Sequence, residues 1–243
     1  MTVVFSGGSD SYLVMANDCA IVNDFPDGRV EYATGGKFFL RNGVGVVTMW
    51  GARDGNRLIS HLNAQELSGD KHSVEDLAQI VHHYLTDSYR PHIDSTADTG
   101  YHVGGFTPDG QLRLYHIYWN VGRSEENQRP HWGSYALEFR QPPPGLTGFM
   151  FNGRHDLVSN LMQSLINEVA RSKLANFPFT PAGVSRLAHF ILRASAEITK
   201  EVSPPFLVHI LSPSRRCITV RVDAVIPSTD ATFAEAIREV GLS

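Results

Sequence analysis

The pattern of apolar and polar positions alternates between stretches typical of strands and stretches typical of helices. The first fifty residues contain short β-prone runs separated by turn-forming clusters, which predicts successive hairpins. These runs are Val3–Phe5, Tyr12–Ala16, Ala20–Val22, Arg29–Ala33, Lys37–Leu40 and Gly45–Met49. Two helices are then predicted, one over residues 55–65 and one that starts at the capping-box pattern Ser73–Asp76.

Strand patterning returns in the middle of the chain. Tyr101–Phe106 and Leu112–Trp119 flank the turn signal Pro108–Gly110, so we expect a hairpin. Ser134–Arg140 is a further predicted strand. The polar stretch Asn120–Trp132 between these strands lacks a period, and we interpret it as a loop insertion.

The last third repeats the order of helices followed by strands. Asp156–Lys173 carries leucines on one helical face, and Thr180 followed by Pro181 predicts the start of another helix. Two strands and a short helix complete the chain, at Phe206–Leu211, Cys217–Val222 and Ala231–Val240. No repeat or linker is visible, so residues 1–243 are expected to form one domain.

Blocks of antiparallel strands separated by helix pairs define the expected fold class. The order predicts an α+β protein with two antiparallel sheets packed face to face and helix pairs on both outer faces. This arrangement is a four-layer αββα sandwich.

The amino-acid composition restricts the possible classes of function more than it restricts the fold class. The chain has 243 residues, 42% of them apolar, and a formal charge of −4. These values indicate a globular chain with a real core, and they disfavour nucleic-acid binding, which needs a basic excess. No apolar run is long enough to span a bilayer, and no signal peptide is visible at the N-terminus. We therefore expect a cytoplasmic protein that binds neither nucleic acid nor membrane.

Metal and cofactor sites are not indicated by the side chains. Cys19 and Cys217 are too few for a disulfide scaffold or a four-cysteine zinc site. The eleven histidines form no His-x-x-x-His pattern, so no metal and no cofactor are predicted. His102 and His116 are expected to face each other across the central hairpin, as packed residues more than as ligands.

The order of elements and four groups of residues resemble the N-terminal-nucleophile (Ntn) hydrolases, and in particular their proteasome branch. The likeness extends from Thr2 to Asp223. It is carried by Thr2–Val4 with Tyr12–Asp18, by Lys37–Leu40 with Gly43–Met49 and residues 50–62, by Gly104–Phe106 with residues 108–117, and by the helix from Thr180 with the last two strands. The connection that leads to Lys37 is a few residues longer than is usual in the family.

The resemblance implies a threonine peptidase or amidohydrolase that acts on a peptide or a small amide. If Met1 is removed, the Thr2 hydroxyl is the nucleophile and its α-amine, with a pKa near ~7.7–8.0, is the base. Lys37 would tune the amine, Asp18 would hold Lys37, and a backbone N–H near Gly51 would bind the oxyanion. Family members assemble in rings, so a homo-oligomer is implied.

Two other functions stay open at this stage. Trp50 stands where the family places its oxyanion glycine, and Asn152 and Gly153 replace its usual serines. With a retained Met1 these departures indicate a catalytically inactive structural or interaction subunit.

The segment Ser6–Ser11 also resembles the phosphate loop of ATP-pyrophosphatases, which would make the protein an adenylating enzyme. A strand–loop–helix order is required there, and β-rich sequence follows instead. We therefore favour a hairpin turn at Gly7–Ser11.

Overall fold

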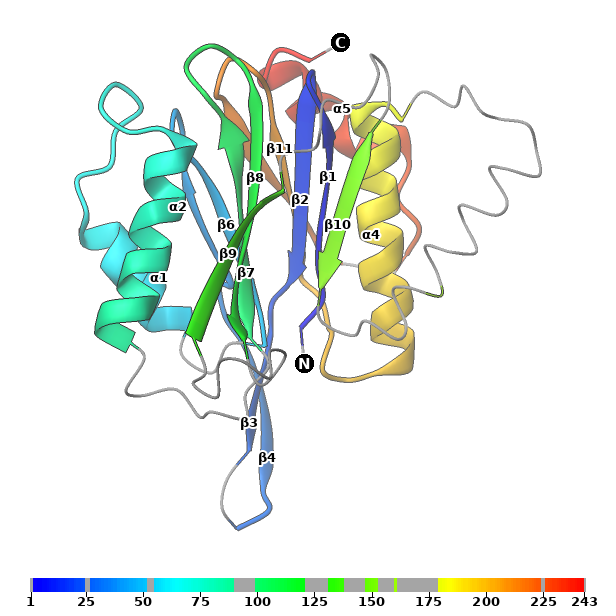
Figure 1. Ribbon diagram of the computed structural model, residues 1–243. Coiled ribbons are helices and arrows are strands. Elements are labelled where there is room, and N and C mark those ends of the chain that lie inside the picture. Colours follow the sequence, from blue (N-terminus) through cyan, green and yellow to red (C-terminus); the bar gives the residue numbers. More distant parts are fainter. Residues whose placement is uncertain are drawn as a thin grey trace.

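Strands dominate the computed structural model, which describes residues 2–24, 27–51, 55–89, 99–120, 131–137, 147–152, 160, 179–223 and 226–242. These strands form three antiparallel sheets (Figure 1). The first sheet has the order β10 (Gly148–Asn152), β1 (Val4–Ser9), β2 (Tyr12–Asp18), β11 (Phe206–Leu211) and β12 (Cys217–Val222). The second sheet has the order β5 (Phe38–Arg41), β6 (Gly45–Trp50), β7 (Gly100–Phe106), β8 (Leu112–Asn120) and β9 (His131–Leu137). The small sheet pairs β3 (Ala20–Asp24) with β4 (Val30–Thr34).

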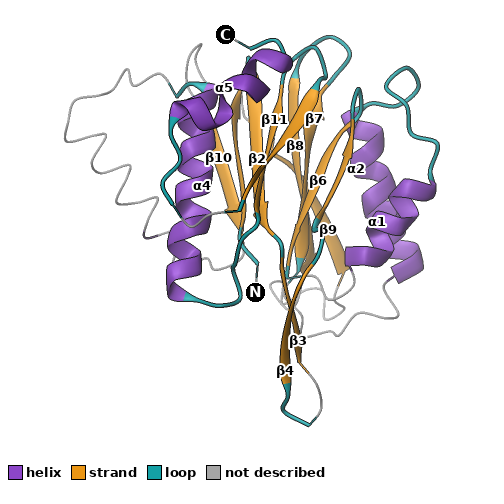
Figure 2. Cartoon of the chain, turned by 180° about the vertical axis from the view of Figure 1, so that it is seen from behind, coloured by secondary structure: helices purple, strands orange, loops and turns teal. Residues whose placement is uncertain are grey.

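The helices cover the outer faces of the two large sheets (Figure 2). They are α1 (Gly55–Ala64), α2 (Val74–His83), α4 (Pro181–Ile198) and α5 (Asp230–Glu239), and a π-helical turn, η1 (Tyr84–Tyr89), extends α2. Two predicted helix starts are confirmed by their caps. Ser73 Oγ accepts from Asp76 N at 3.2 Å, and Thr180 Oγ1 accepts from Gly183 N at 3.1 Å.

The prediction of a four-layer αββα sandwich is wrong as stated. The structure has three antiparallel sheets where two were expected, and its described part holds four α-helices that do not form a clear pair on each face. All of the predicted helix Asp156–Lys173 except residue 160 lies outside the described residues, and the short α5 contacts α4 and β12. Periodicity identified the strands, but it could not show that Ala20–Thr34 pairs only with itself.

The boundaries of the expected loop insertion also change. Trp119 pairs with Trp132 and Asn120 with His131, so the β8–β9 ladder includes both ends of the predicted loop 120–132. β9 is described over His131–Leu137, and residues 138–140 of the predicted strand, like residues 121–130 of the predicted loop, lie outside the described residues. Backbone pairing determines how far β8 and β9 extend toward this loop, and the pattern of polar side chains does not reveal that pairing.

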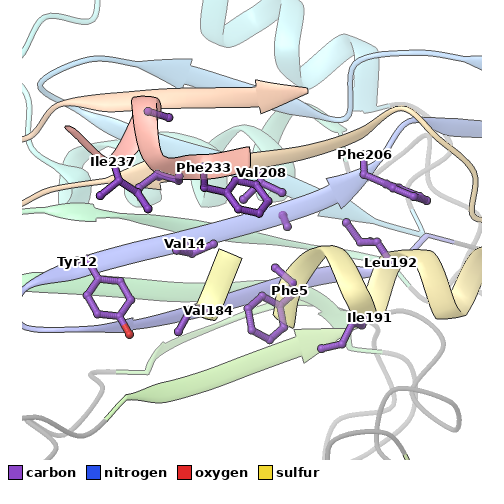
Figure 3. Packing of buried hydrophobic residues seen from close by; sticks show 14 of the residues in the cluster. Phe5, Tyr12, Val14, Val184, Ile191, Leu192, Phe206, Val208, Phe233 and Ile237 are labelled. Carbon is purple, nitrogen blue, oxygen red and sulfur yellow. The ribbon is translucent and has the colours of Figure 1, made fainter. Parts of the chain in front are cut away.

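Each large sheet packs its outer face on helices through an apolar layer. Between the first sheet and the helices α4 and α5, the fully buried side chains include Phe5, Val14, Leu192, Phe206 and Phe233 (Figure 3). Burying one such side chain contributes about 1.5–3 kcal/mol. A corresponding layer joins the second sheet to α1 and α2, with Leu58, Leu62, Leu77, Val81 and Val103 at its centre.

The interior between the two large sheets is apolar at one end and polar at the other. Its apolar end contains the cluster of Leu13, Met15, Val46, Phe106, Leu114, Met150, Leu211 and Cys217. Alternate residues of a strand share a face, so β2 continues inward with Asn17 after Leu13 and Met15. On β7 the inward face changes in the same way, from the apolar Phe106 to the polar His102. The buried polar side chains therefore lie toward the end of the interior where β2 reaches Asp18.

The small sheet connects the ends of two strands that carry predicted site residues. β3 begins two residues after Asp18, and β4 ends three residues before Lys37. The hairpin projects from the body of the molecule on the side of the N-terminus (Figure 1). The connection from Asp18 to Lys37 consists largely of this hairpin.

Candidate active site

Three of the predicted site residues meet in one buried cluster. Thr2 precedes β1, Asp18 ends β2 and Lys37 immediately precedes β5. Lys37 Nζ donates to Thr2 Oγ1 at 2.5 Å and to Asp18 Oδ2 at 3.1 Å. Thr2, Asp18 and Lys37 are 5%, 0% and 9% exposed, so the ammonium lies in a largely dry environment where its charge acts strongly.

The Asp18 carboxylate is fixed by backbone donors as well as by Lys37. Val3 N donates to Oδ1 at 3.3 Å and Ala20 N donates to Oδ2 at 2.9 Å. Burial raises the pKa of the Asp18 carboxyl, while the charge of Lys37 and these hydrogen bonds oppose that rise. The carboxylate therefore has a defined orientation between the start of β1 and the start of β3.

Gly51, the fourth predicted residue, lies directly after β6. Its φ of +66° is in the left-handed region that glycine adopts without strain. Two residues earlier, Met49 N donates to Lys37 O at 3.2 Å, which keeps this end of β6 beside the Lys37 segment. Trp50 is 5% exposed, and its ring centroid lies 5.9 Å from that of His116.

A first histidine network crosses the polar end of the interior. Ser6 Oγ is 2.9 Å from His102 Nδ1, and His102 Nε2 is 2.7 Å from Asn152 Oδ1. Since an amide oxygen only accepts, Nε2 carries the proton and Ser6 donates to Nδ1. Burial lowers the pKa of His102 to about 3, so the ring is neutral near pH 7. Ser6 and His102 are 0% exposed, so this Ser–His–Asn arrangement is structural.

A second histidine network leads directly to the site aspartate. His209 Nε2 lies 3.1 Å from Asn17 Oδ1, and its Nδ1 lies 2.8 Å from Thr219 Oγ1. Asn17 Nδ2 in turn donates to Asp18 O at 2.8 Å. Burial lowers the pKa of His209 to about 3 as well.

Sequence reasoning anticipated only part of these networks. The pairing of His102 with His116 was expected, and their rings do meet, with centroids 5.4 Å apart. Ser6 and Asn152 were not connected to them, and His209 was not singled out. Strand alternation could have placed His209 on an inward face, but no sequence signal identifies its partner 192 residues away.

The Ser6–Ser11 segment forms a hairpin and no phosphate loop. β1 continues through Gly7 and Gly8 to Ser9, which pairs with Tyr12, so the turn is shorter than predicted and β2 follows it directly. A Cβ atom on Gly8 would meet Tyr12 O at 2.6 Å. The glycines therefore permit close strand packing, and the helix that a phosphate loop requires does not follow.

Metal and membrane features were also sought in the described part of the chain. There, no group of three or more His, Cys, Asp and Glu side chains is placed to hold a metal ion. None of the described helices combines the length and the apolar character needed to cross a bilayer.

Comparison with solved structures shows which proteins share the fold of this chain. The matching proteins are Anbu structures. Anbu (ancestral beta-subunit) from Yersinia bercovieri is 14% identical with a TM-score of 0.63, covering 98% of this chain and 95% of that chain. Anbu from Hyphomicrobium sp. strain MC1 is 15% identical with a TM-score of 0.60, at 98% and 95% coverage. Anbu from Pseudomonas aeruginosa, solved as a helical assembly, is 17% identical with a TM-score of 0.59, at 98% and 91% coverage.

These findings correct the assignment of the chain to the proteasome branch from its motifs. No family model matches the sequence, and no curated protein matches it. Anbu proteins are among the structures that share its fold, and identities below a fifth establish the fold alone. Short motifs in a shared order do not by themselves establish that a chain belongs to a family.

Proposed function

We propose that this protein hydrolyses a peptide or small amide bond with Thr2 as its nucleophile, once Met1 has been removed. The observation that supports this function best is the contact of Lys37 Nζ with Thr2 Oγ1 at 2.5 Å, beside Asp18. A lysine ammonium at this distance favours the alkoxide form of the hydroxyl. Asp18, in turn, fixes the position of the ammonium.

The proposed mechanism uses the free α-amine of Thr2 as the base. The amine takes the hydroxyl proton while Oγ1 attacks the carbonyl carbon, and the tetrahedral oxyanion accepts a hydrogen bond from backbone N–H near Gly51. The amine then protonates the leaving amine, which leaves an ester on Thr2. Water hydrolyses this ester, with the amine again as base, and regenerates the enzyme.

Met1 decides whether this mechanism can operate, because an amide nitrogen at Thr2 cannot accept the proton. Intact mass and N-terminal sequencing of the natural protein test this first. The processed protein is then treated with a β-lactone probe, which acylates nucleophilic hydroxyls. We expect Thr2 to be acylated and Thr2→Ala to be unreactive, with hydrolysis of peptide amides reduced by about 10³-fold or more.

Ser6→Ala is the matched control, because Ser6 is a buried hydroxyl on β1, the strand that follows Thr2. It should keep the acylation. Lys37→Met should lower the rate by about 10²–10³-fold, the loss typical of removing one electrostatic stabiliser. Retention of Met1 on the natural protein would contradict the proposal.

A catalytically silent subunit is the second candidate, and two observations favour it. Trp50 precedes Gly51 where the resemblance calls for glycine, and the Thr2 side chain is only 5% exposed. In this case the Thr2–Lys37–Asp18 cluster would serve only to join β1, β2 and β5. A processed protein whose Thr2 is not acylated would favour this candidate.

We also propose that the chain associates with copies of itself. The Pseudomonas aeruginosa Anbu structure with the same fold is a helical assembly. A composition without a strong net charge is compatible with self-association.

A further inference from the structure

The β3–β4 hairpin leaves a strand edge uncovered. All five residues of β4 are exposed, including the large side chains Val30 at 47% and Tyr32 at 56%. The hairpin extends away from the two large sheets in both views (Figures 1 and 2). Isolated two-stranded hairpins are at best marginally stable in water, so this element gains stability from any strand that pairs with it.

Backbone pairing shows which residues form the free edge of β4. Gly35 N donates to Cys19 O at 2.9 Å, next to the Ala20–Thr34 pair. Antiparallel ladders alternate between hydrogen-bonded and non-hydrogen-bonded pairs, so Ala33 and Glu31 direct their backbone groups toward β3. The outward N–H and C=O groups of β4 therefore belong to Val30, Tyr32 and Thr34.

The β4 edge has strong strand-forming residues at all three outward positions. β-branched and aromatic residues favour strands, and natural sheets usually guard an open edge with charge or proline. The only charged side chain within β4 is Glu31, whose backbone points inward. The outward backbone groups of β3, by contrast, belong to Ala20, Val22 and Asp24, a set that contains one small and one acidic residue. β4 is thus the edge better suited to pairing.

We propose that β4 pairs with β4 of a second copy of this chain across a twofold axis at Tyr32. In this antiparallel register Tyr32 faces Tyr32 of the second copy, and Val30 faces Thr34 in both directions. Glu31 then faces Ala33, so no like charges oppose each other. All three outward residues of each strand form hydrogen bonds, and the small sheets join into a four-stranded one.

The five-residue ladder predicts a weak, concentration-dependent dimer, because its contact area is well below that of a stable interface. The natural cysteines are buried, at 4% for Cys19 and 6% for Cys217, so introduced cysteines can report the register. Directly opposed residues in such a ladder have Cα atoms about 5.5 Å apart, within the range that a disulfide spans.

Oxidative cross-linking of single-cysteine substitutions tests the register. Tyr32→Cys should form a disulfide-linked dimer. Val30→Cys and Thr34→Cys should cross-link with each other when mixed and much more slowly with themselves. Ala33→Cys on the same strand is the matched control, since it should face Glu31. Sedimentation velocity should show a dimer that Tyr32→Asp abolishes, because two carboxylates then meet at the axis.

The interface is overturned if Tyr32→Cys cross-links no faster than Ala33→Cys or than Ile226→Cys, an exposed site outside the hairpin at 65% exposure. A wild-type protein that stays monomeric at every concentration also overturns it. Cross-linking of Tyr32→Cys to a different residue or to another protein would assign the edge to another occupant and reject the twofold register.

A second consequence rests on the proposed function. The base of the hairpin holds Asp18 through Ala20 N and leads to Lys37 two residues after Gly35. Pairing of β4 should steady this base, so acylation of Thr2 should rise with protein concentration and fall several-fold in Tyr32→Asp. If wild-type Thr2 is never acylated, the proposed function fails, and the cross-linking pattern still decides the interface separately.

Discussion

The two ends of the interior between the large sheets use the same strands in different ways. At one end, apolar side chains such as Leu13 and Met15 of β2 and Leu211 of β11 fill the space. At the other end, Asn17 and His209 lie on those same strands and form hydrogen bonds across the sheet. The apolar end requires only volume and burial, whereas each polar group at the other end requires a specific partner.

This difference indicates how the site is held in place. Apolar packing tolerates small shifts between sheets, but hydrogen bonds fix the distance and direction of each group. Asn17 connects His209 to the backbone of Asp18, so the orientation of the site carboxylate is determined partly by strand β11. The two ends can be separated experimentally, because they should respond differently to acid, to cavities and to isosteric changes.

Lowering the pH should produce the largest change in the free energy of unfolding, and it should act only through the polar end of the interior. His102 and His209 have folded-state pKa values of about 3, below the unfolded value of 6.5. Their contribution to stability is complete above pH 6.5 and declines as the pH falls toward 3, by about 1.4 kcal/mol per pH unit for each histidine. Urea unfolding measured between pH 8 and pH 4 should show this slope.

The control for the acid prediction is Ile198→Ala, a change at a 60% exposed position that removes no titratable group. It should leave the slope unchanged. His116, whose pKa burial lowers to about 4, contributes to the same slope, so His209→Gln should remove about a third of it, even though the variant is less stable at pH 7. A slope that is the same in His209→Gln as in the wild type would contradict the assignment of the neutral ring.

A cavity at the apolar end should have the next largest effect. Leu114 is 1% exposed between the sheets, and Leu114→Ala should cost about 2–5 kcal/mol in the free energy of unfolding. Its pH slope should match that of the wild type. Ile198→Ala, at a 60% exposed position, should change stability by about 0.5 kcal/mol at most. Urea titrations at pH 7 measure both.

An isosteric change at the polar end should cost less than the cavity. Asn17→Leu keeps the branching and the number of side-chain heavy atoms, but it leaves His209 without its Asn17 partner and removes the donor to Asp18 O. We expect a loss of about 1–3 kcal/mol in the free energy of unfolding, the cost of leaving buried polar groups unpaired. A variant as stable as the wild type would show that the second histidine network does not constrain this end.

The smallest effect is expected two residues earlier on the same strand. Met15→Leu conserves volume among apolar neighbours and should cost less than about 1.5 kcal/mol. Comparison with Asn17→Leu by the same urea titration isolates the contribution of hydrogen bonds to the free energy of unfolding. If Met15→Leu were the more damaging change, the proposed division between the two ends would be wrong.

Local patterns were enough to predict most elements and three members of the candidate site. Thr2 directly precedes a recognisable β-prone run, Asp18 follows one by two residues and Lys37 begins one, so their residue types and order were visible in the sequence. The β3–β4 strands were also visible as runs. Their pairing into a separate sheet was not, because register depends on which edges are left open after the large sheets form.

The sequence by itself determined the strand and helix runs, the helix caps at Ser73 and Thr180, and the absence of a basic surface charge. These properties follow from short-range sterics, capping and composition, which act within a few residues. Only the tertiary structure placed Lys37 against Thr2, and only it joined His209 to Asn17. Such contacts unite residues far apart in the chain, and their geometry is fixed by the packing of whole sheets.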